Sequence, residues 1–333
     1  AMPTGAWVPQ IQASRHNAGE AFVVTNDYRR GDFKPYVFRT TDFGKTWTRL
    51  LDENKVKGYA LCILQDPTEP NLIFAGTENG LWVSLDNGVN FQQWKNGYPS
   101  VSTYDLAIQE READLAIATF GRSLWILDDI RPLRKLASVR GMLAKNLTVF
   151  PSPDAYQIAY RPATGYEWSL AGLGDAENKR RGAPISYLIN KLPESSRRDS
   201  TATPAPGNES TPAEARPGAG QGAGRGGQGG GRGGFSGRAG AGGSSRDSVW
   251  VRIYNDKNEL LRTTRWRAAS GFNRSYWGME EKGFRQPGFP KPRPGAPEPG
   301  GLQVLPGTYK VVISLGRESD STFITIKDDP RIG

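Results

Sequence analysis

The feature that most constrains this sequence is a repeat with a period of 43 to 44 residues in its first 135 positions. The segment RTTDFGKTWTRL, from Arg39, lines up with VSLDNGVNFQQW, from Val83. In both segments a Ser or Thr is followed by Asp, then by Gly, and finally by an aromatic residue. Repeats of this length indicate equivalent units that stack on one another and share a hydrophobic core.

The repeated segment predicts a tight turn. Its first copy contains Thr40, Asp42, Gly44, Thr46 and Trp47, and its second contains Ser84, Asp86, Gly88, Asn90 and Phe91. In such a turn Asp accepts backbone N–H groups and Gly supplies a positive φ angle. One carboxylate per turn is too few for calcium, which takes about 6–8 oxygen ligands. We therefore expect both turns to be structural and no metal site to be present.

A third, degenerate copy follows the first two. LIFAGTENGLWVSLD, from Leu72, aligns without gaps with LAIATFGRSLWILDD, from Leu115, and this alignment equates Trp82 with Trp125. After the third copy, Ile130, Arg131 and Pro132 stand where the turn residues would be. We therefore expect the final hairpin turn of this copy to be lost.

The apolar runs of the repeat region are short and alternating, which is typical of β-strands. They are AFVVT, ALCILQ, LIFAGT, GLWVSL, DLAIQ, LAIAT and SLWIL. Four short strands in every 40 to 50 residues are typical of a β-propeller blade. The prediction is an all-β chain in which residues 1–135 form about three blades of a partial β-propeller. Because propellers typically have 4–8 blades, we expect the missing blades to come from a longer parent or from another chain.

The second half of the sequence predicts a different β-structure. LTVF, ISYLI, VWVRIY, TYKVVISL and STFITIK are further short apolar runs, and they favour an immunoglobulin-like β-sandwich. We assign 136–193 to a linker and the start of the sandwich, and 247–333 to its remainder. Between them, 194–246 is rich in Gly, Arg and Pro and has Phe235 as its one large apolar residue. Such a composition predicts a disordered insert.

Composition and charge exclude several classes of protein. With one cysteine, Cys62, and one histidine, His16, the sequence has no internal disulfide framework and no multi-His metal centre. No apolar run is long enough for a membrane-spanning helix. The net charge is +9, and Arg-Gly-Gly triplets begin at Arg225 and Arg232. These triplets fit either RNA binding or a solubilising insert; we expect no nucleic-acid partner and no cofactor.

The turn motif resembles a motif of known protein families. Ser/Thr-x-Asp-x-Gly-x-Thr/Asn-Trp/Phe is identified as the Asp-box, or BNR repeat, of sialidases, xyloglucanase-type glycoside hydrolases and sortilin-type receptors. IQASRHNAGEAFVV and DLAIQEREADLAIATFGRSLWILDDIRPL resemble bacterial sortilin-like propeller proteins that carry a glycosyl hydrolase label. GFNRSYWGM and LPGTY are similar to the sandwich of the flagellar hook-capping type. The resemblance implies an extracytoplasmic location, although AMPTGAW lacks the pattern of a signal peptide.

Glycoside hydrolysis requires two carboxylates about 5–10 Å apart. Asp105, the first residue of DLAIQ, and Asp66, directly after ALCILQ, are the acidic catalytic candidates on the expected inner strands, and Arg122 is a third catalytic candidate. Asp128 and Asp129 form a further acidic pair. For each of these residues the alternative role is turn formation or capping, since Asp is a preferred turn residue.

Candidate binding residues are Arg122, Trp125 and Tyr104. The Gly-Arg-x-x-Trp segment around Arg122 resembles the loop that closes the last blades in the family, which implies that Arg122 faces the channel or the upper surface and pairs with an anionic ligand. The alternative is an ion pair between Arg122 and Asp128 or Asp129.

An aromatic cluster and two single residues, Cys62 and His16, are further features to be interpreted. Trp266, Phe272, Tyr276 and Trp277 form an aromatic cluster that fits either a carbohydrate platform or the core of the sandwich. Cys62 is expected to be a buried small hydrophobe. His16 is expected to be a turn or surface residue rather than a catalytic one.

The sequence thus leaves two functional classes open. We expect an extracytoplasmic scaffold or receptor-like module that binds peptide, glycan or protein partners. The alternative is a glycoside hydrolase related to xyloglucanases and sialidases, whose paired carboxylates lie largely on blades outside this chain. An acidic pair in one cleft, with one raised pKa, would distinguish the second class from the first.

Overall fold

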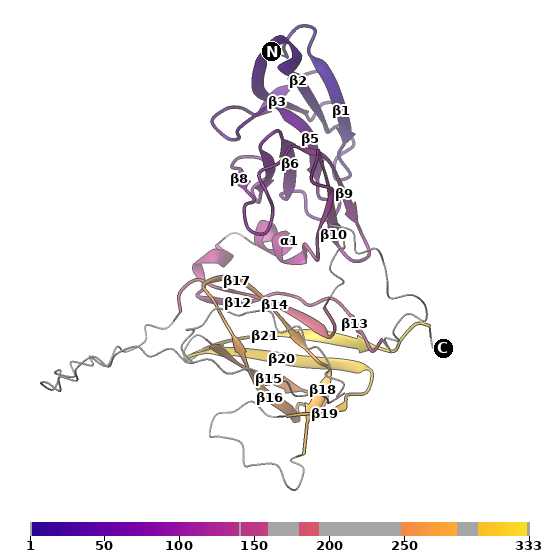
Figure 1. Ribbon diagram of the computed structural model, residues 1–333, viewed down its shortest axis with the longest axis vertical. Helices are drawn as coiled ribbons and strands as arrows, with labels where there is room; N and C mark the ends of the chain where they lie inside the picture. The colour runs from indigo at the N-terminus through magenta and orange to yellow at the C-terminus, as the bar shows by residue number, and fades with distance from the viewer. Residues whose placement is uncertain (1, 140, 159–179, 193–247, 285–298, 332–333) are drawn as a thin grey trace, which may run out of the picture. The chain divides into compact units, whose positions relative to one another are not determined.

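The computed structural model describes residues 2–139, 141–158, 180–192, 248–284 and 299–331. The insert expected at 194–246 lies outside these ranges. The described residues are mostly β-strands, with one α-helix, α1 (Arg131–Ser138) (Figure 1). No described helix has the length and apolar character needed to cross a membrane.

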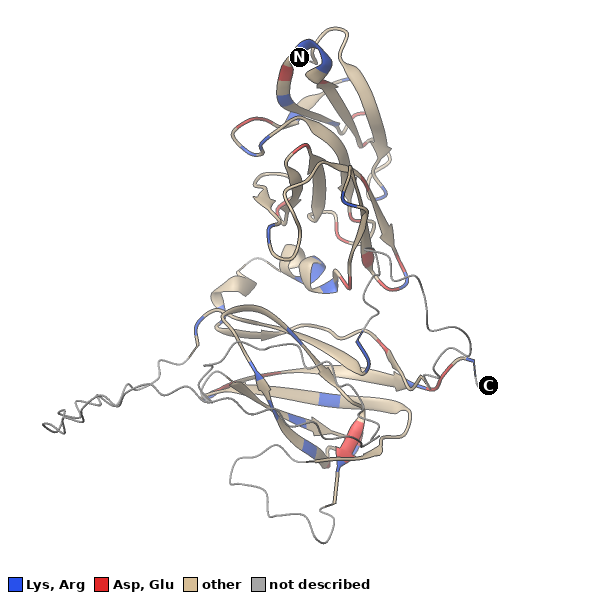
Figure 2. Ribbon diagram, in the orientation of Figure 1, with Lys and Arg blue, Asp and Glu red and all other residues tan. Residues whose placement is uncertain are grey.

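The repeat region folds into three consecutive antiparallel sheets, each with its strands in sequence order. The first sheet contains β1 (Trp7–Ala13), β2 (Ala21–Asp27), β3 (Asp32–Thr40) and β4 (Thr48–Leu51). The second contains β5 (Ala60–Gln65), β6 (Ile73–Thr77), β7 (Gly80–Ser84) and β8 (Gln92–Gln93). The third contains β9 (Thr103–Gln109), β10 (Asp114–Thr119) and β11 (Leu124–Leu127). Figure 2 shows that charged residues gather mainly in the loops between these strands.

The three sheets stack on one another. Phe22, Val24 and Val37 of the first sheet share a core with Trp82 and Phe91 of the second. The opposite face of the second sheet forms another core with the third sheet, in which Leu72 and Phe74 meet Leu115 and Ile117. All residues of β6 and β7 are consequently buried. The alternation predicted for LIFAGT and GLWVSL is therefore wrong, because both faces of β6 and β7 are buried and both carry apolar residues.

Close packing between the second and third sheets requires a glycine in β6. A Cβ atom at Gly76 would lie 2.6 Å from the carbonyl oxygen of Thr103 at the start of β9, and it would also collide with the sulfur of Cys62. Cys62 is buried, and its thiol donates to the same Thr103 carbonyl at 3.6 Å. The small side chains at this point let β9 approach both β5 and β6 closely.

The first Asp-box is a hydrogen-bonded turn between β3 and β4. The hydroxyl of Thr40 donates to Asp42 Oδ1 at 2.8 Å and accepts from the Gly44 backbone N–H at 2.9 Å. Thr46 donates twice to Asp42, from its N–H at 2.9 Å and from its hydroxyl at 2.6 Å. The indole N–H of Trp47 donates to the Gly44 carbonyl at 3.1 Å. Gly44 has a φ of 83°, which glycine adopts without strain.

The second Asp-box repeats this geometry between β7 and β8. The Ser84 hydroxyl donates to Asp86 at 2.8 Å and accepts from the Gly88 N–H at 2.9 Å. Asn90 donates to Asp86 from its backbone and from its side-chain amide, at 2.8 and 2.7 Å. Phe91 is buried against the first sheet. Both aspartates are thus occupied by hydrogen bonds within their turns.

The third sheet differs from the other two in length and in register. In the described part of the chain β11 pairs with β10 alone, and α1 follows where the earlier sheets have a fourth strand. Trp82 lies opposite Ala75, whereas Trp125 lies opposite Ile117. The gapless alignment equates Ala75 with Ala118, so it is wrong by one residue in β10. The β10–β11 hairpin has a longer loop, and this loop absorbs the difference.

Helix α1 is attached to the second sheet by a buried ion pair. Arg134 Nε lies 3.0 and 2.9 Å from the two carboxylate oxygens of Asp66, which directly follows β5 and is fully buried. Asp66 Oδ1 also accepts the backbone N–H groups of Thr68 and Glu69, both at 2.8 Å. The ring nitrogen Nε2 of His16 lies 2.8 Å from the Asp66 carbonyl oxygen. Asp66 therefore caps a turn and positions α1.

The second half of the chain forms two facing sheets with a common core. One sheet has the order β12 (Leu147–Val149), β14 (Ala183–Ile189), β17 (Gly271–Trp277). The other has the order β13 (Ala155–Tyr156), β21 (Glu318–Lys327), β20 (Gly307–Leu315), β15 (Ser248–Tyr254), β16 (Leu260–Arg267). β18 (Glu280–Lys282) pairs with β19 (Gly300–Gln303). The β13–β21 pair is parallel, and the other strand pairs of this half are antiparallel.

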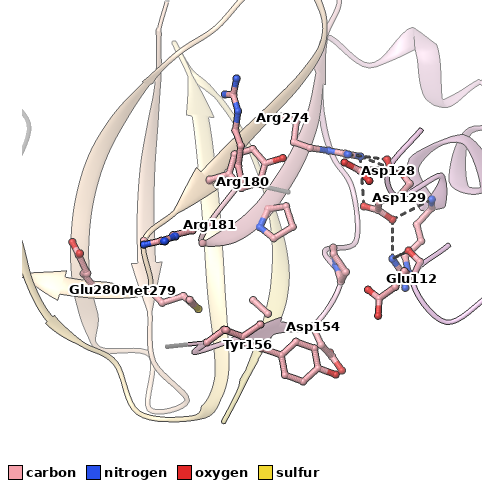
Figure 3. Close-up of a pocket in the computed structure, with 18 of the residues that line it drawn as sticks. Glu112, Asp128, Asp129, Asp154, Tyr156, Arg180, Arg181, Arg274, Met279 and Glu280 are labelled. Atoms are coloured by element: carbon pink, nitrogen blue, oxygen red, sulfur yellow. Dashed lines mark hydrogen bonds and ion pairs between the residues drawn. The ribbon is translucent and has the colours of Figure 1, made fainter. Parts of the chain in front are cut away.

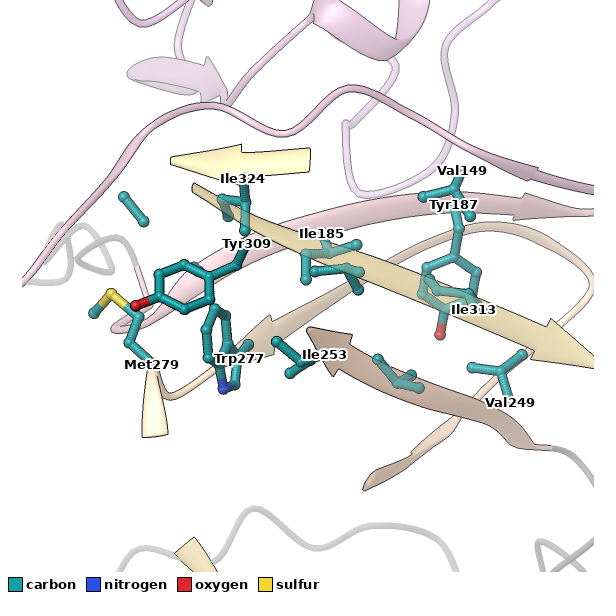
Figure 4. Packing of buried hydrophobic residues seen from close by; sticks show 14 of the residues in the cluster. Val149, Ile185, Tyr187, Val249, Ile253, Trp277, Met279, Tyr309, Ile313 and Ile324 are labelled. Atoms are coloured by element: carbon teal, nitrogen blue, oxygen red, sulfur yellow. The ribbon is translucent and has the colours of Figure 1, made fainter. Parts of the chain in front are cut away.

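Trp277 lies inside this second core (Figure 4). Its ring meets that of Tyr309 edge to face, with the centroids 5.4 Å apart, and its indole N–H donates to the Glu280 carbonyl at 3.0 Å. Tyr187 fills the other end of the core and stacks on Trp266 at 6.5 Å. Of the two interpretations of the aromatic cluster, the core one therefore holds for Trp277.

We expect Asp42 to titrate well below the usual range of a carboxyl group. Hydrogen bonds from Thr46, first from its hydroxyl and then from its backbone, lower the Asp42 pKa from 3.8 to about 2. Because the folded-state pKa is depressed, this stabilisation is present above about pH 4 and is lost as the pH falls through 2. Carboxyl carbon NMR across this window measures the midpoint, which Thr46→Val should raise and Thr48→Val should leave unchanged. A wild-type midpoint at 3.8 would contradict the turn geometry.

Removing one member of the buried Asp66–Arg134 pair should destabilise the fold. Asp66→Ala leaves the Arg134 guanidinium uncompensated, which typically costs about 3–5 kcal/mol. The matched control is Glu110→Ala, because Glu110 forms an ion pair with Arg15 in which both side chains are more than half exposed. Urea denaturation should show a change below about 1 kcal/mol for this control. Equal effects of the two substitutions would argue against a structural role for Asp66.

Candidate functional site

The first strands of the three sheets begin at one common end. Trp7 and Gln10 of β1, Leu61 of β5, and Tyr104 and Asp105 of β9 line one cavity of about 580 Å³. The opposite ends of the same strands surround a separate, smaller cavity of about 110 Å³. Asp66 follows the far end of β5, so the structure does not bring the two catalytic candidates, Asp66 and Asp105, together. We call the first space the aromatic cavity.

Three aromatic residues, Trp7, Tyr28 and Tyr104, line the aromatic cavity, and further rings pack against Tyr28 and Tyr104. The Tyr28 ring stacks on Tyr59 with centroids 4.5 Å apart, and Phe33 lies 6.2 Å from Tyr59. Tyr104 packs against Phe120, which belongs to the β10–β11 loop, at 5.7 Å. Trp7 at the start of β1 is 61% exposed. Large exposed rings around one cavity are typical of binding surfaces rather than of a solvated face.

A cation is held over two of these rings. The guanidinium carbon of Arg29 lies 5.6 Å from the centre of the Trp7 ring and 5.2 Å from that of Tyr28. Among the described residues Arg29 has no carboxylate partner, whereas its neighbour Arg30 pairs with Asp27. The cation–π contacts therefore orient Arg29 at the cavity wall while its N–H groups remain available.

Two polar residues, Asn26 and Asp105, also line the aromatic cavity. Asn26 is 2% exposed; its amide nitrogen donates to the Ala60 carbonyl at 3.3 Å, and its amide oxygen has no hydrogen-bond partner in the described structure. A buried acceptor without a partner is costly unless a ligand or a water supplies a donor. Asp105 is exposed, and its Oδ1 accepts from the Leu106 N–H at 2.9 Å.

Carboxylate chemistry is limited in this cavity. Asp105 is the one acidic residue among those of the described chain that line it. Hydrogen bonding lowers the pKa of Asp42, and it also lowers that of Asp32, through Tyr36. For Asp86, burial acts to raise the pKa, but the bonds from Asn90 and Ser84 lower it overall. Burial raises the pKa of the Cys62 thiol, so Cys62 is not a nucleophile.

A second space of about 580 Å³, the charged cavity, lies next to Asp129. Asp129 forms ion pairs with the guanidinium groups of Arg131 and Arg274, and Figure 3 shows Asp129 beside Arg274. Asp129 Oδ1 lies 2.8 Å from Arg131, and its Oδ2 lies 3.6 Å from Arg274. Arg274, from β17, also donates to the carbonyls of Asp128 and Asp129 at 2.8 and 3.1 Å. These charges compensate one another, so we assign them a structural role.

The remaining sequence candidates lie around the β10–β11 loop. Arg122 is exposed, and Asp129 pairs with Arg131. Trp125 donates from its indole N–H to the Arg122 carbonyl at 2.9 Å and meets Tyr98 edge to face at 5.6 Å. Trp125 thus packs against the second sheet, and Tyr104 is the member of this group that lines the aromatic cavity.

Sequence reasoning found Tyr104 and Asp105 but missed Trp7, Asn26 and Arg29. A signal was present for part of the cavity, because Leu61 and Tyr104 are separated by one repeat and both lie near the start of a first strand. No repeat spacing relates Trp7 or Arg29 to these positions. Only the three-dimensional structure shows that Trp7 and Arg29 line the same cavity as Leu61 and Tyr104.

Comparison with known proteins identifies no family. No family model matches the sequence, and no curated protein matches it. Among solved structures, the chain is similar to the crystal structure of the GH74 enzyme of Niastella koreensis, with 14% sequence identity and a TM-score of 0.32. The match covers 55% of this chain and 28% of that enzyme. Similarity at this level supports no inference about activity.

Proposed function

We propose that this chain is a carbohydrate-binding module and that the aromatic cavity is its binding site. In this proposal the three stacked sheets are blades of an Asp-box propeller, and the second half is an immunoglobulin-like accessory domain. The observation that carries the proposal is the combination of exposed aromatic rings with a buried, unpartnered amide oxygen in one cavity. The expected setting is extracytoplasmic, where polysaccharides and glycoproteins are found.

The chemistry of the aromatic cavity matches that of a sugar chain. A pyranose ring has an apolar face of C–H groups, which packs on aromatic rings, and a rim of hydroxyl groups, which donate and accept hydrogen bonds. Trp7 and Tyr104 offer rings for the apolar faces. Asn26 Oδ1 and Asp105 accept hydroxyl hydrogens, and Arg29 donates to hydroxyl oxygens. Such a mixture of apolar walls and a few oriented polar groups is typical of small-molecule sites.

Binding is favoured over hydrolysis by the number of carboxylates. Both mechanisms of glycoside hydrolysis use a pair of acids, one of them protonated near neutral pH. Among the described residues the aromatic cavity contributes Asp105 alone. A hydrolase that used this cavity would need a second acid from outside the described part of the chain. The alternative function, a glycoside hydrolase, therefore requires a residue that this cavity does not supply.

Replacement of one cavity ring should weaken carbohydrate binding about tenfold. A ring–sugar contact of about 1–1.5 kcal/mol corresponds to this factor. Isothermal titration with xyloglucan oligosaccharides and with a sialylated oligosaccharide measures the affinity of Trp7→Ala and Tyr104→Ala. Phe323→Ala is the control, because Phe323 is 62% exposed but belongs to β21 of the second half.

Two results would contradict the proposal. One is binding that is unchanged in both Trp7→Ala and Tyr104→Ala. The other is the absence of binding to either sugar class by the wild-type chain. Asp105→Asn separates binding from catalysis: for a binding module it should alter affinity by a few-fold, whereas for a hydrolase it should abolish the release of reducing ends.

A further inference from the structure

The five-stranded sheet of the second half has one face in the core and one face at the surface. Val251 and Ile253 of β15 are buried in the core, as are Val311 and Ile313 of β20. Successive side chains of a strand lie on opposite faces of a sheet, so the alternate residues of these strands point outward. We call the outward residues of β16, β15 and β20 the outer sheet face. Cross-strand pairing arranges them in three rows, Arg265–Trp250–Ser314, Thr263–Arg252–Val312 and Tyr254–Lys310.

Three basic residues cross the outer sheet face in a diagonal line. Lys310 lies on β20, Arg252 on β15 and Arg265 on β16, and each step crosses one strand and moves along by one row. Diagonal neighbours on adjacent strands are about 7–8 Å apart. Figure 2 shows Lys and Arg residues on strands of this sheet. We call Lys310, Arg252 and Arg265 the basic diagonal.

Acidic residues do not neutralise the basic diagonal from within the sheet. None of the residues in the three rows is acidic. The acids of the neighbouring strand β21, Glu318 and Asp320, pair with buried residues of β20 and so belong to the core-side set of their strand. In the described part of the chain, neither Arg252 nor Lys310 forms an ion pair. The face therefore carries a net positive charge.

Trp250 holds one end of the basic diagonal in place. The guanidinium carbon of Arg265 lies 5.4 Å from the centre of the Trp250 ring, and its Nε donates to the Ser248 hydroxyl at 2.5 Å. Trp250 itself is 44% exposed. A cation–π contact orients a guanidinium without removing its charge. Arg265 is thus a positioned cation at the surface of the sheet.

We propose that the outer sheet face binds an anionic polysaccharide, whose carboxylate or sulfate groups lie along the basic diagonal. Guanidinium groups bind carboxylates and related oxyanions through two parallel N–H bonds, and the ammonium group of Lys310 adds a point charge. The hydroxyl of Ser314, in the row of Trp250 and Arg265, is placed to exchange hydrogen bonds with sugar hydroxyls. This site is separate from the aromatic cavity, and neither proposal depends on the other.

Other occupants fit the outer sheet face less well. The segment 194–246 of this chain carries seven Arg and four acidic residues, and the whole chain has a net charge of +9. Neither that segment nor a second copy is therefore complementary in charge to the basic diagonal. A single nucleic-acid strand binds through aromatic faces that are open to its bases, whereas the guanidinium of Arg265 already lies over the Trp250 ring. The face thus favours a polymer that is bound through its charged and hydroxyl groups.

Isothermal titration of the full chain with heparin, which carries sulfates, with polygalacturonate, which carries carboxylates, and with neutral dextran tests the proposal. The double variant Arg252→Glu/Lys310→Glu should weaken binding of the anionic polysaccharide about tenfold or more, because two attractive contacts become repulsive. The matched control is Lys57→Glu/Lys95→Glu, which changes the net charge equally at exposed positions next to β5 and β8. Its affinity should stay within about twofold of wild type, because exposed charges farther than a Debye length from the polymer are screened.

A second variant and a stability measurement separate binding from folding. Arg252→Gln/Lys310→Gln removes the two charges without reversing them, so its affinity should lie between those of the wild type and the Glu variant. Urea denaturation should give wild-type midpoints for both variants, because neither side chain belongs to the core.

The polysaccharide that binds identifies the anionic group. Binding to heparin alone would assign sulfate to the basic diagonal, and binding to polygalacturonate alone would assign carboxylate; either result supports the proposal. Four results would overturn it: no binding to either anionic polysaccharide at low salt, equal binding of dextran, equal losses in the Arg252/Lys310 and Lys57/Lys95 variants, or tighter binding of a single-stranded oligothymidylate. The last result would assign the face to nucleic acid.

Discussion

The burial of both faces of β6 and β7 is the constraint on which the rest of this structure depends. A sheet whose strands read IFAGT and GLWVS has no solvent face, so it requires a neighbouring sheet on each side. The first and third sheets supply these neighbours, and the absent side chain of Gly76 lets β9 approach closely. The outer sheets inherit the same requirement, because they are built from the same repeat. On the third sheet this requirement is not fully met within the described residues, because Leu124 and Ile126 are 60% and 53% exposed.

The Asp-boxes stabilise their turns and contribute no residue to the lining of the aromatic cavity. In both turns the Asp carboxylate accepts hydrogen bonds from residues four positions later, which closes the turn and sets the end of the hairpin. Their carboxylates are therefore occupied. The residues of the aromatic cavity, by contrast, lie outside the two turns, and the copies of the repeat differ there, since Leu61 is equivalent to Tyr104. When turns maintain the fold and the strand ends carry other residues, one architecture can support many functions.

Much of the fold, but little of the site, follows from the sequence. The Asp-box turns were predictable because their hydrogen bonds connect residues within five positions of one another. The register of β10 was not, because LAIA alternates Leu and Ile with Ala and so fits either face when the loop length changes. The role of Asp66 was ambiguous for another reason. Its ion-pair partner Arg134 lies 68 residues away in the sequence, and no residue close to Asp66 indicates this pairing. The insert expected at 194–246 lies outside the described residues.

The width of the aromatic cavity depends on how the three sheets pack. Trp7 belongs to the first sheet and Tyr104 to the third, so the distance between the two rings depends on how closely three sheets pack, not on any single loop. A substitution in the cores between the sheets would shift these rings relative to each other without touching them. The position of Asn26 adds to this dependence, because Asn26 lines the cavity from the first sheet and its amide donates to the Ala60 carbonyl of the second sheet. Sheet packing thus sets the width of the cavity, and with it the size of the group that the proposed site would hold.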